Sequence, residues 1–262
     1  MQQIYIAAIV ISLAAVIFWE SLSPLFPTST VPLARWLRNL ALSALALGAM
    51  LAAPALFWAA MHALGLQPGG WGGWLQRWGV PVWGQWLAAF LALDGMAYAL
   101  HRLSHAVPWL WRLHAVHHSD VELDATTAHR HHPLENLFIA LVTLPVLVLL
   151  APPVEAVLAY SLLAVVVSTV AHGNLRLPAG LDRVLRCLLV TPAYHRIHHS
   201  REQVQTDSNY ATVFPWFDYL LGSASAVPAD GGRSVVMGLE RHRDAASQTL
   251  PALLLAPFRS KR

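Results

Sequence analysis

The chain has 262 residues, of which 56% are hydrophobic and only 12% are charged, and its mean hydropathy is +0.49. Soluble domains carry roughly 25% charged residues, so this composition excludes an ordinary soluble domain and indicates that much of the chain contacts lipid. The net charge of +3 comes almost wholly from arginine, and no basic run with interleaved aromatic residues indicates nucleic-acid binding.

The first half of the chain predicts three membrane spans. Residues 4–19 form an uninterrupted apolar run without a preceding positive segment, which favours a retained span over a cleaved signal peptide. A second span covers about 40–64, and the Gly- and Trp-rich segment 67–85 is typical of an interfacial loop. A third span covers about 86–100 and leads directly into His101.

The second half predicts two more spans, at 134–150 and 154–170, joined by a tight hairpin at 151–153. Residues 181–190 predict an amphipathic or interfacial helix with Asp182, Arg183 and Arg186 on its polar side. Cys187 is the only cysteine, so no disulfide framework is expected.

The distribution of arginine predicts the topology. Arginine concentrates before the second span, after the third and after the fifth. All these positions share one side if five spans follow an outside N-terminus, and that side is cytoplasmic by the positive-inside rule. The sequence therefore predicts an all-α, multi-pass integral membrane protein with about four to five transmembrane helices and a cytoplasmic histidine-rich helical cap. We expect one membrane domain over 1–262, divided into N-terminal spans (1–90), a catalytic region (91–222) and a cytoplasmic tail (223–262).

The histidines carry the strongest chemical signal. Twelve of the fourteen lie between His101 and His199, and only His62 and His242 stand well apart. An H-x-x-x-H pair begins at His101, and H-x-x-H-H triplets begin at His114 and His195. On a helix, positions i, i+3 and i+4 share one face, so each set can present its imidazoles to a common point.

These patterns predict a di-metal site, because neutral imidazole is the commonest protein metal ligand. A cluster of imidazoles without metal would leave many polar atoms needing partners. The predicted ligands are His101, His105, His114, His117, His118, His132, His172, His195, His198 and His199. His129 and His131 are interpreted as surface residues or as residues that support the ligands.

Asp94 lies inside the third predicted span, where a carboxylate is costly and normally has a partner. It shares a helix face with Tyr98 and His101, so we predict that it accepts a hydrogen bond from an imidazole and orients it. Hydrogen bonding between helices is the alternative role.

Several motifs resemble the fatty acid hydroxylase/sterol desaturase superfamily. The segments H-R-L-S-H from His101 and W-R-L-H-A-V-H-H-S from Trp111 are similar to its first two histidine boxes. R-H-H-P-L-E from Arg130 is similar to its R-x-H-P-x-E segment, which supports His132. H-G-N from His172, Y-H-R-I-H-H-S from Tyr194, N-Y from Asn209 and W-F-D from Trp216 complete a match over about 94–222. Ala211 stands where the family usually has glycine.

The resemblance implies a non-haem centre of two iron ions, O2 as co-substrate, and hydroxylation or desaturation of a lipid or sterol-like substrate. It also implies that Glu135, with Asp94, orients imidazoles. All-histidine ligation suits zinc or copper about as well as iron, so zinc is expected in some preparations. The Q-P-G-G segment at 67–70 lacks the histidine of a cytochrome b5 haem motif. Electrons are therefore expected from a separate donor, cytochrome b5-like or a ferredoxin with its reductase.

Other functions remain open at this point. An acyl-lipid desaturase of the other histidine-box family uses similar boxes, although the H-P-L-E and H-G-N segments favour the first family. A metal transporter or chaperone would need ligands within the spans and access from both sides. A di-zinc hydrolase would need neither O2 nor a reductant, and a non-catalytic sterol-binding relative is the last alternative. We expect location in the inner or plasma membrane if the protein is bacterial.

Overall fold

The computed structural model describes residues 2–27, 32–63 and 73–259. These residues form helices and loops, with two isolated β-bridges that pair Pro24 with Leu175 and Ser200 with Met237. The helices are α1 (Gln2–Leu22), α2 (Pro32–Ala63), α3 (Trp74–Arg77), α4 (Val82–Ala106), α5 (Pro108–His118), the 3-10 helix η1 (Ala125–His129), α6 (Pro133–Leu150), α7 (Val154–His172), α8 (Ala179–Leu185), α9 (Pro192–His198), α10 (Gln203–Thr206), α11 (Trp216–Leu221) and α12 (Leu250–Arg259).

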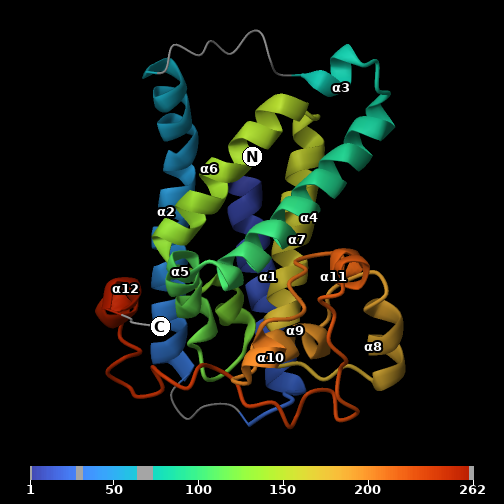
Figure 1. Ribbon diagram of the computed structural model, residues 1–262. Helices are drawn as coiled ribbons and strands as arrows, with labels where there is room; N and C mark the ends of the chain where they lie inside the picture. The colour runs from blue at the N-terminus through green and yellow to red at the C-terminus, as the bar shows by residue number, and fades with distance from the viewer. Residues whose placement is uncertain (1, 28–31, 64–72, 260–262) are drawn as a thin grey trace.

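The long helices form a bundle, and the short helices α8 to α11 gather at one end of it, whereas α3 lies at the other end (Figure 1). Among the described residues, α1, α2, α6 and α7 are long and apolar enough to cross a membrane. They correspond to the first, second, fourth and fifth predicted spans. The third predicted span lies in α4, which has 25 residues but does not reach the same hydropathy because it includes Asp94, His101 and Arg102. The predicted fold class, all-helical with four to five spans, is confirmed.

The outer surface of the bundle is apolar, as a membrane environment requires. Ile11, Phe18 and Leu22 on α1 are exposed, as are Leu51 and Leu56 on α2. In water such a surface would be unfavourable, whereas in lipid it matches the surrounding hydrocarbon chains. The helical backbone satisfies its own hydrogen bonds, which is the other condition for crossing a bilayer.

Two helix pairs organise the bundle. α2 packs mainly against α6, and the buried Ala46 and Ala53 on α2 allow the close approach that small residues give transmembrane helices. α1 packs against α7, with Leu13 and Val16 in one apolar cluster with Leu175. The long helices therefore hold the end of α7, which carries His172, against the short elements of the cap.

Two predicted interfacial segments differ from expectation. Of the loop predicted at 67–85, residues 67–72 lie outside the described residues. α4 begins at Val82, within the rest of that predicted loop, because Pro81 occupies its N-cap position. The helix predicted at 181–190 ends at Leu185, and Asp182 is buried rather than placed on an exposed polar side. Its carboxylate lies 3.7 Å from Arg186 Nε, so the ion pair accounts for its burial.

A buried polar network joins the cap to α2 and to the C-terminal segment. Arg35 on α2 pairs with Asp120 and Asp124, which follow the second histidine box. Arg130 is fully buried and donates to the Val116 carbonyl at 2.9 Å, to Asn39 Oδ1 at 2.9 Å and to Gln248 Oε1 at 2.7 Å. Removing one partner from such a network would leave a buried charge unsatisfied, so the network ties these segments together.

The region predicted as a tail, residues 223–262, contains α12, which packs against α5 and α2. Leu253 on α12 is buried in one cluster with Leu42 and Val116. The described part of this region is therefore attached to the helix that bears the second histidine box.

Candidate metal centre

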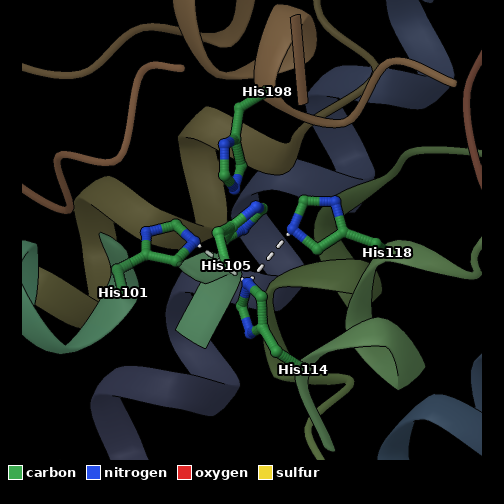
Figure 2. A group of neighbouring side chains, drawn as sticks. All are labelled: His101, His105, His114, His118 and His198. Atoms are coloured by element: carbon green, nitrogen blue, oxygen red, sulfur yellow. Dashed lines mark hydrogen bonds between the residues drawn. The ribbon is translucent and has the colours of Figure 1, made fainter. Parts of the chain in front are cut away.

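Nine of the ten histidines predicted as ligands lie in two adjacent groups. The first group contains His101, His105, His114, His118 and His198, and Figure 2 shows their rings converging from several directions. The second group contains His117, His172, His195 and His199. In each group one ring nitrogen per residue lies within 4.8 Å of the others. The rings of His118 and His199, one from each group, stack at 4.6 Å between centroids, so the groups adjoin.

The first group depends on the sharp turn between α4 and α5. Val107 adopts an extended backbone (φ −96°, ψ 120°), as the residue before a proline prefers, and Pro108 then begins α5. The turn folds His101 and His105, at the end of α4, back toward His114 on α5. Their helical spacing places the two α4 rings on one face, as the sequence predicted.

The triplet spacing divides each box between the two groups. On α5, His114 and His118 belong to the first group and His117 belongs to the second. On α9 and its C-cap, His198 belongs to the first group, whereas His195 and His199 belong to the second. The helical alternation in each H-x-x-H-H box therefore brings the two groups side by side, and α7 adds His172 to the second.

The first group has firmly oriented rings because four of its Nδ1 atoms donate hydrogen bonds. His101 donates to the Tyr210 carbonyl at 2.7 Å and His198 to the Ser208 carbonyl at 2.7 Å. His114 Nδ1 lies 2.6 Å from Glu135 Oε1, and His105 Nδ1 lies 3.1 Å from Asp207 Oδ1. An Nδ1 that donates leaves Nε2 of a neutral imidazole unprotonated, which is the form that binds a metal.

The Nε2 atoms then face one another in a way that suits a cation. His101 Nε2 and His114 Nε2 are 3.0 Å apart, although the Nδ1 contacts of both rings assign a lone pair to each Nε2. A hydrogen bond between these two Nε2 atoms would need a proton on one of them. Burial, followed by the neighbouring imidazoles, lowers the pKa of His101 well below its ordinary value, so His101 does not carry this second proton. His105 Nε2 and His198 Nε2 are buried without a hydrogen-bond partner. This donor set fits a metal ion.

The second group has the same convergence but fewer supporting contacts. His172 Nδ1 donates to the Ser168 carbonyl at 2.8 Å, whereas Nδ1 of His117, His195 and His199 is buried without a partner. His172 Nε2 lies 3.1 Å from His117 Nε2, 3.0 Å from His195 Nε2 and 3.2 Å from His199 Nε2. Because the His172 proton is on Nδ1, its Nε2 has one lone pair and can accept from only one of these three rings, so this donor set also fits a metal ion.

The buried imidazoles predict loss of stability in acid. The pKa is held well below its ordinary value for His105, His117, His118, His195 and His199. Burial is the largest cause, followed by repulsion from neighbouring imidazoles. Below about pH 6.5 the unfolded chain binds protons at these residues and the folded chain does not, so stability falls as the pH falls.

Each such histidine lowers the stability by at most about 1 kcal/mol per pH unit, and the slope steepens as the unfolded chain becomes fully protonated. We therefore expect the thermal unfolding midpoint of metal-free protein to decrease steadily from pH 7 to pH 5.5. The measurement is a series of unfolding curves in detergent at fixed ionic strength. A midpoint that stayed constant or rose toward pH 5.5 would contradict the buried, neutral state of the cluster.

His132 is the one predicted ligand that lies outside both groups. Pro133 occupies the first position of α6, which makes His132 the N-cap, and its Nδ1 accepts from the Leu134 N–H at 3.2 Å. Its Nε2 lies 3.2 Å from the Leu254 carbonyl on α12. Both ring nitrogens are used elsewhere, so the prediction that His132 belongs to the ligand set is not supported by its position.

His131 lies beside the groups instead. Its ring stacks on that of His117 with centroids 4.5 Å apart, and its Nδ1 lies 3.4 Å from Glu135 Oε2. Together with His114 and Glu135 it forms a third set of converging ligand atoms. His129 points elsewhere, with Nε2 at 3.2 Å from Thr169 Oγ1.

The two carboxylates singled out from the sequence have different surroundings. Glu135 is buried and contacts His114 directly, as described above. Asp94 is buried too, but it contacts no histidine: its Oδ1 accepts from the Tyr160 hydroxyl at 3.0 Å and from the Val213 N–H at 3.3 Å. The prediction that Asp94 orients an imidazole is therefore corrected, and the alternative of hydrogen bonding between helices describes its contacts.

The trailing N-Y and W-x-D residues shape the loop that supports the first group. Asp218 accepts from the N–H groups of Tyr210 and Ala211 at 2.9 and 2.8 Å, and Asn209 Nδ2 donates to the Tyr194 carbonyl at 2.9 Å. Ala211, the departure from the usual glycine, is not among the residues with positive φ, so alanine fits there. The sequence did not identify the Ser208 and Tyr210 carbonyls, because backbone acceptors leave no residue-type signal. It did not identify Asp207 either, because this carboxylate is distant in the sequence from His105.

A cavity of about 160 Å³ lies against both groups. His101 and His114 line it from the first group, and His117, His172 and His195 from the second. The rest of its wall is mainly apolar, with Ala97 and Leu100 from α4, Ile139 from α6 and Ala171 from α7. The histidines therefore share the wall of this cavity with apolar side chains from the long helices.

Comparison with known proteins agrees with this site. Residues 86–223, more than half of the chain, match the family described as fatty acid hydroxylase, and the chain belongs to that family. It is 33% identical over 143 residues to the human alkylglycerol monooxygenase, and this alignment covers 54% of this chain and 31% of that protein. It is 34% identical over 146 residues to the ornithine lipid hydroxylase OlsE of Rhizobium tropici, covering 53% of this chain and 43% of that protein.

A third relative is a plant protein. The very-long-chain aldehyde decarbonylase GL1-1 of Oryza sativa subsp. indica is 33% identical over 161 residues, which covers 56% of this chain and 25% of that protein. The chain thus aligns with less than half of the length of each of these relatives. No solved structure gives a significant match.

Proposed function

We propose that the protein is a membrane-bound, metal-dependent oxygenase that hydroxylates a C–H bond of a lipid. The observation that carries the proposal is the pair of histidine groups that line a cavity whose other walls are mainly apolar. Family membership supports it, because two of the relatives are named as a monooxygenase and a hydroxylase of lipids. The desaturase alternative uses the same kind of centre, and the names of these two relatives favour hydroxylation.

The ligand set is part of the proposal. Five histidines would hold one metal ion, His101, His105, His114, His118 and His198, and four would hold the other, His117, His172, His195 and His199. Two bound iron ions would supply reductive activation of O2. In the overall reaction one oxygen atom enters the C–H bond as a hydroxyl, and two electrons and two protons from outside the chain reduce the other atom to water.

The chain's own residues have defined tasks in this proposal. Glu135 and the carbonyls of Ser208 and Tyr210 keep imidazole Nδ1 protonated and Nε2 free for the metal. Leu100, Ile139 and Ala171 line the cavity and receive an apolar chain, and they limit the access of water to the histidines. A lipid can enter from the bilayer between the long helices.

The orientation in the membrane, the electron donor and the class of lipid are also part of the proposal. The arginine distribution supports a cytoplasmic location of the histidine cap. A separate one-electron donor, cytochrome b5-like or a ferredoxin with its reductase, would supply the electrons. The substrate is proposed only as a lipid with a long apolar part, because the cavity wall is apolar.

The test combines metal analysis with isotope labelling. The protein is purified in detergent, reconstituted with ferrous iron and analysed by elemental mass spectrometry, and membranes with and without the protein are then incubated under ¹⁸O2. We expect about two iron ions per chain and an ¹⁸O-labelled hydroxyl in a lipid that forms only with the protein. Oxygen derived from water would instead indicate a hydrolase and contradict the proposal.

A further inference from the structure

A basic groove, separate from the histidine cavity, lies between α8, α9 and the loop at 227–233. Its volume is about 410 Å³. The arginines that line it are Arg176, Arg183, Arg186, Arg196 and Arg233. The carboxylates in its wall are Asp182 and Asp230, which leaves three positive charges in excess. A concave site with this charge attracts anions.

Arg196 forms the buried part of this groove. It is only 1% exposed, and its guanidinium donates to the carbonyls of Gly231 at 2.6 Å and Leu175 at 3.3 Å. Its Nε is buried without a hydrogen-bond partner, and its guanidinium carbon lies 5.6 Å from the centroid of the Phe26 ring. Asp182 and Asp230 act on it electrostatically, but among the described residues neither forms an ion pair with it, so its buried charge is only partly balanced and favours an anion in the groove.

The outer arginines of the groove are available to a ligand. Arg176, Arg183 and Arg233 are exposed, and within the described ranges their side chains make no hydrogen bond or ion pair. Arg186 differs from these three, because its Nε lies 3.7 Å from Asp182 Oδ2 in an ion pair. A planar guanidinium donates two parallel hydrogen bonds to phosphate oxygens, which makes phosphate the best-matched anion.

The surface beside the groove is suited to the membrane interface. Val184 on α8 is 65% exposed and the nearby Leu188 is 57% exposed. Trp216 and Tyr219 on the adjacent α11 are also exposed and donate hydrogen bonds to the carbonyls of Cys187 and Arg186. Exposed apolar residues with tryptophan and tyrosine at their edge are typical of the headgroup region of a bilayer.

From the buried guanidinium of Arg196, the excess of arginine and the adjacent apolar surface, we propose that the groove binds the phosphate of an anionic phospholipid. The bound lipid is not the substrate, because Ala193 and Arg196 line the groove whereas His195 on α9 lines the histidine cavity. The lipid would instead attach α9 to the membrane surface. The proposal depends on membrane insertion and not on the oxidation chemistry.

The test compares lipids on the purified full-length protein in detergent. Native mass spectrometry and thermal unfolding are measured with dioctanoyl phosphatidylglycerol, with dioctanoyl phosphatidylcholine and with inorganic phosphate. The groove variant combines Arg183→Glu and Arg233→Glu, both at exposed positions. The matched control is Arg259→Glu at the exposed end of α12, which lies on the opposite side of the molecule from α8 (Figure 1).

We expect the unaltered protein and the Arg259→Glu control to bind phosphatidylglycerol about tenfold more tightly than phosphatidylcholine, and the groove variant to lose this preference. Metal content that stays unchanged in the groove variant verifies its folding. Equal binding of the two lipids, or a preference that survives in the groove variant, would overturn the proposal. Stabilisation by inorganic phosphate as strong as that by phosphatidylglycerol would show a site for free phosphate and overturn the lipid assignment.

Discussion

Replacing His117 or His198 with alanine should remove bound metal and reduce any oxygenase activity by at least about 100-fold. The two variants act on different groups: His198 belongs to the five-histidine group and His117 to the four-histidine group. Each replacement deletes a converging Nε2 and leaves an empty buried space. With four histidines in its group at the start, the His117→Ala variant has three left and should lose its metal more completely.

The measurement is metal per chain by elemental mass spectrometry, made before and after treatment with a chelator. His62→Ala is the matched control, because His62 is exposed near the end of α2 and belongs to neither group. His242→Ala is a second control and should also keep full metal content. If His117→Ala retained two tightly bound metals and full activity, the four-histidine group would not be a metal site.

The positions of the histidines could be predicted from the sequence because helical spacing is a local property. H-x-x-x-H and H-x-x-H-H place rings on one face of a helix, and the spans bring the ends of α4, α5, α7 and α9 together. The division of each box between two groups follows from the same geometry, since residues i+3 and i+4 point to slightly different sides.

The position of His132 could have been predicted from a local signal in the sequence. A proline at the first position of a helix makes the preceding residue the N-cap, and the His132-Pro133 sequence carries that signal. The N-cap side chain turns toward the helix N–H groups, here the Leu134 N–H, which leaves only Nε2 of His132 for another partner, the Leu254 carbonyl. His131, one residue earlier, is then the residue that lies beside His117 and Glu135.

Asp94 shows the limit of reasoning from a shared helix face. It precedes His101 by seven residues, which corresponds to about 10 Å along an α-helix, so the two side chains cannot meet directly. Its actual partners, Tyr160 on α7 and the Val213 backbone, are distant in the sequence. The contact between Gln248 and Arg130 also joins residues that are distant in the sequence, so it could not be predicted from a local pattern. For this reason the sequence predicted the C-terminal region as a tail.

Glu135→Gln should weaken metal binding by the five-histidine group about 10- to 100-fold, whereas Asp94→Asn should leave it unchanged. Glutamine has the shape of glutamate and can still accept the 2.6 Å hydrogen bond from His114 Nδ1, but it lacks the negative charge. The charge favours the Nδ1-protonated form of His114 and makes its Nε2 a stronger donor to a metal. The loss therefore appears in metal affinity first, with a smaller effect on folding.

Asp94→Asn is the matched comparison because it also exchanges a buried carboxylate for an amide of equal size. Its Oδ1 can still accept from Tyr160 and Val213, so we expect a loss of about 1 kcal/mol in stability and no change in metal affinity. Titration of metal-free protein with Co²⁺, followed by absorption, measures the affinity, and thermal unfolding measures the stability. An equal loss of Co²⁺ affinity in both variants would mean that Asp94 acts on the histidines after all. Unchanged affinity in Glu135→Gln would mean that the contact with His114 does not set the metal-binding strength of the group.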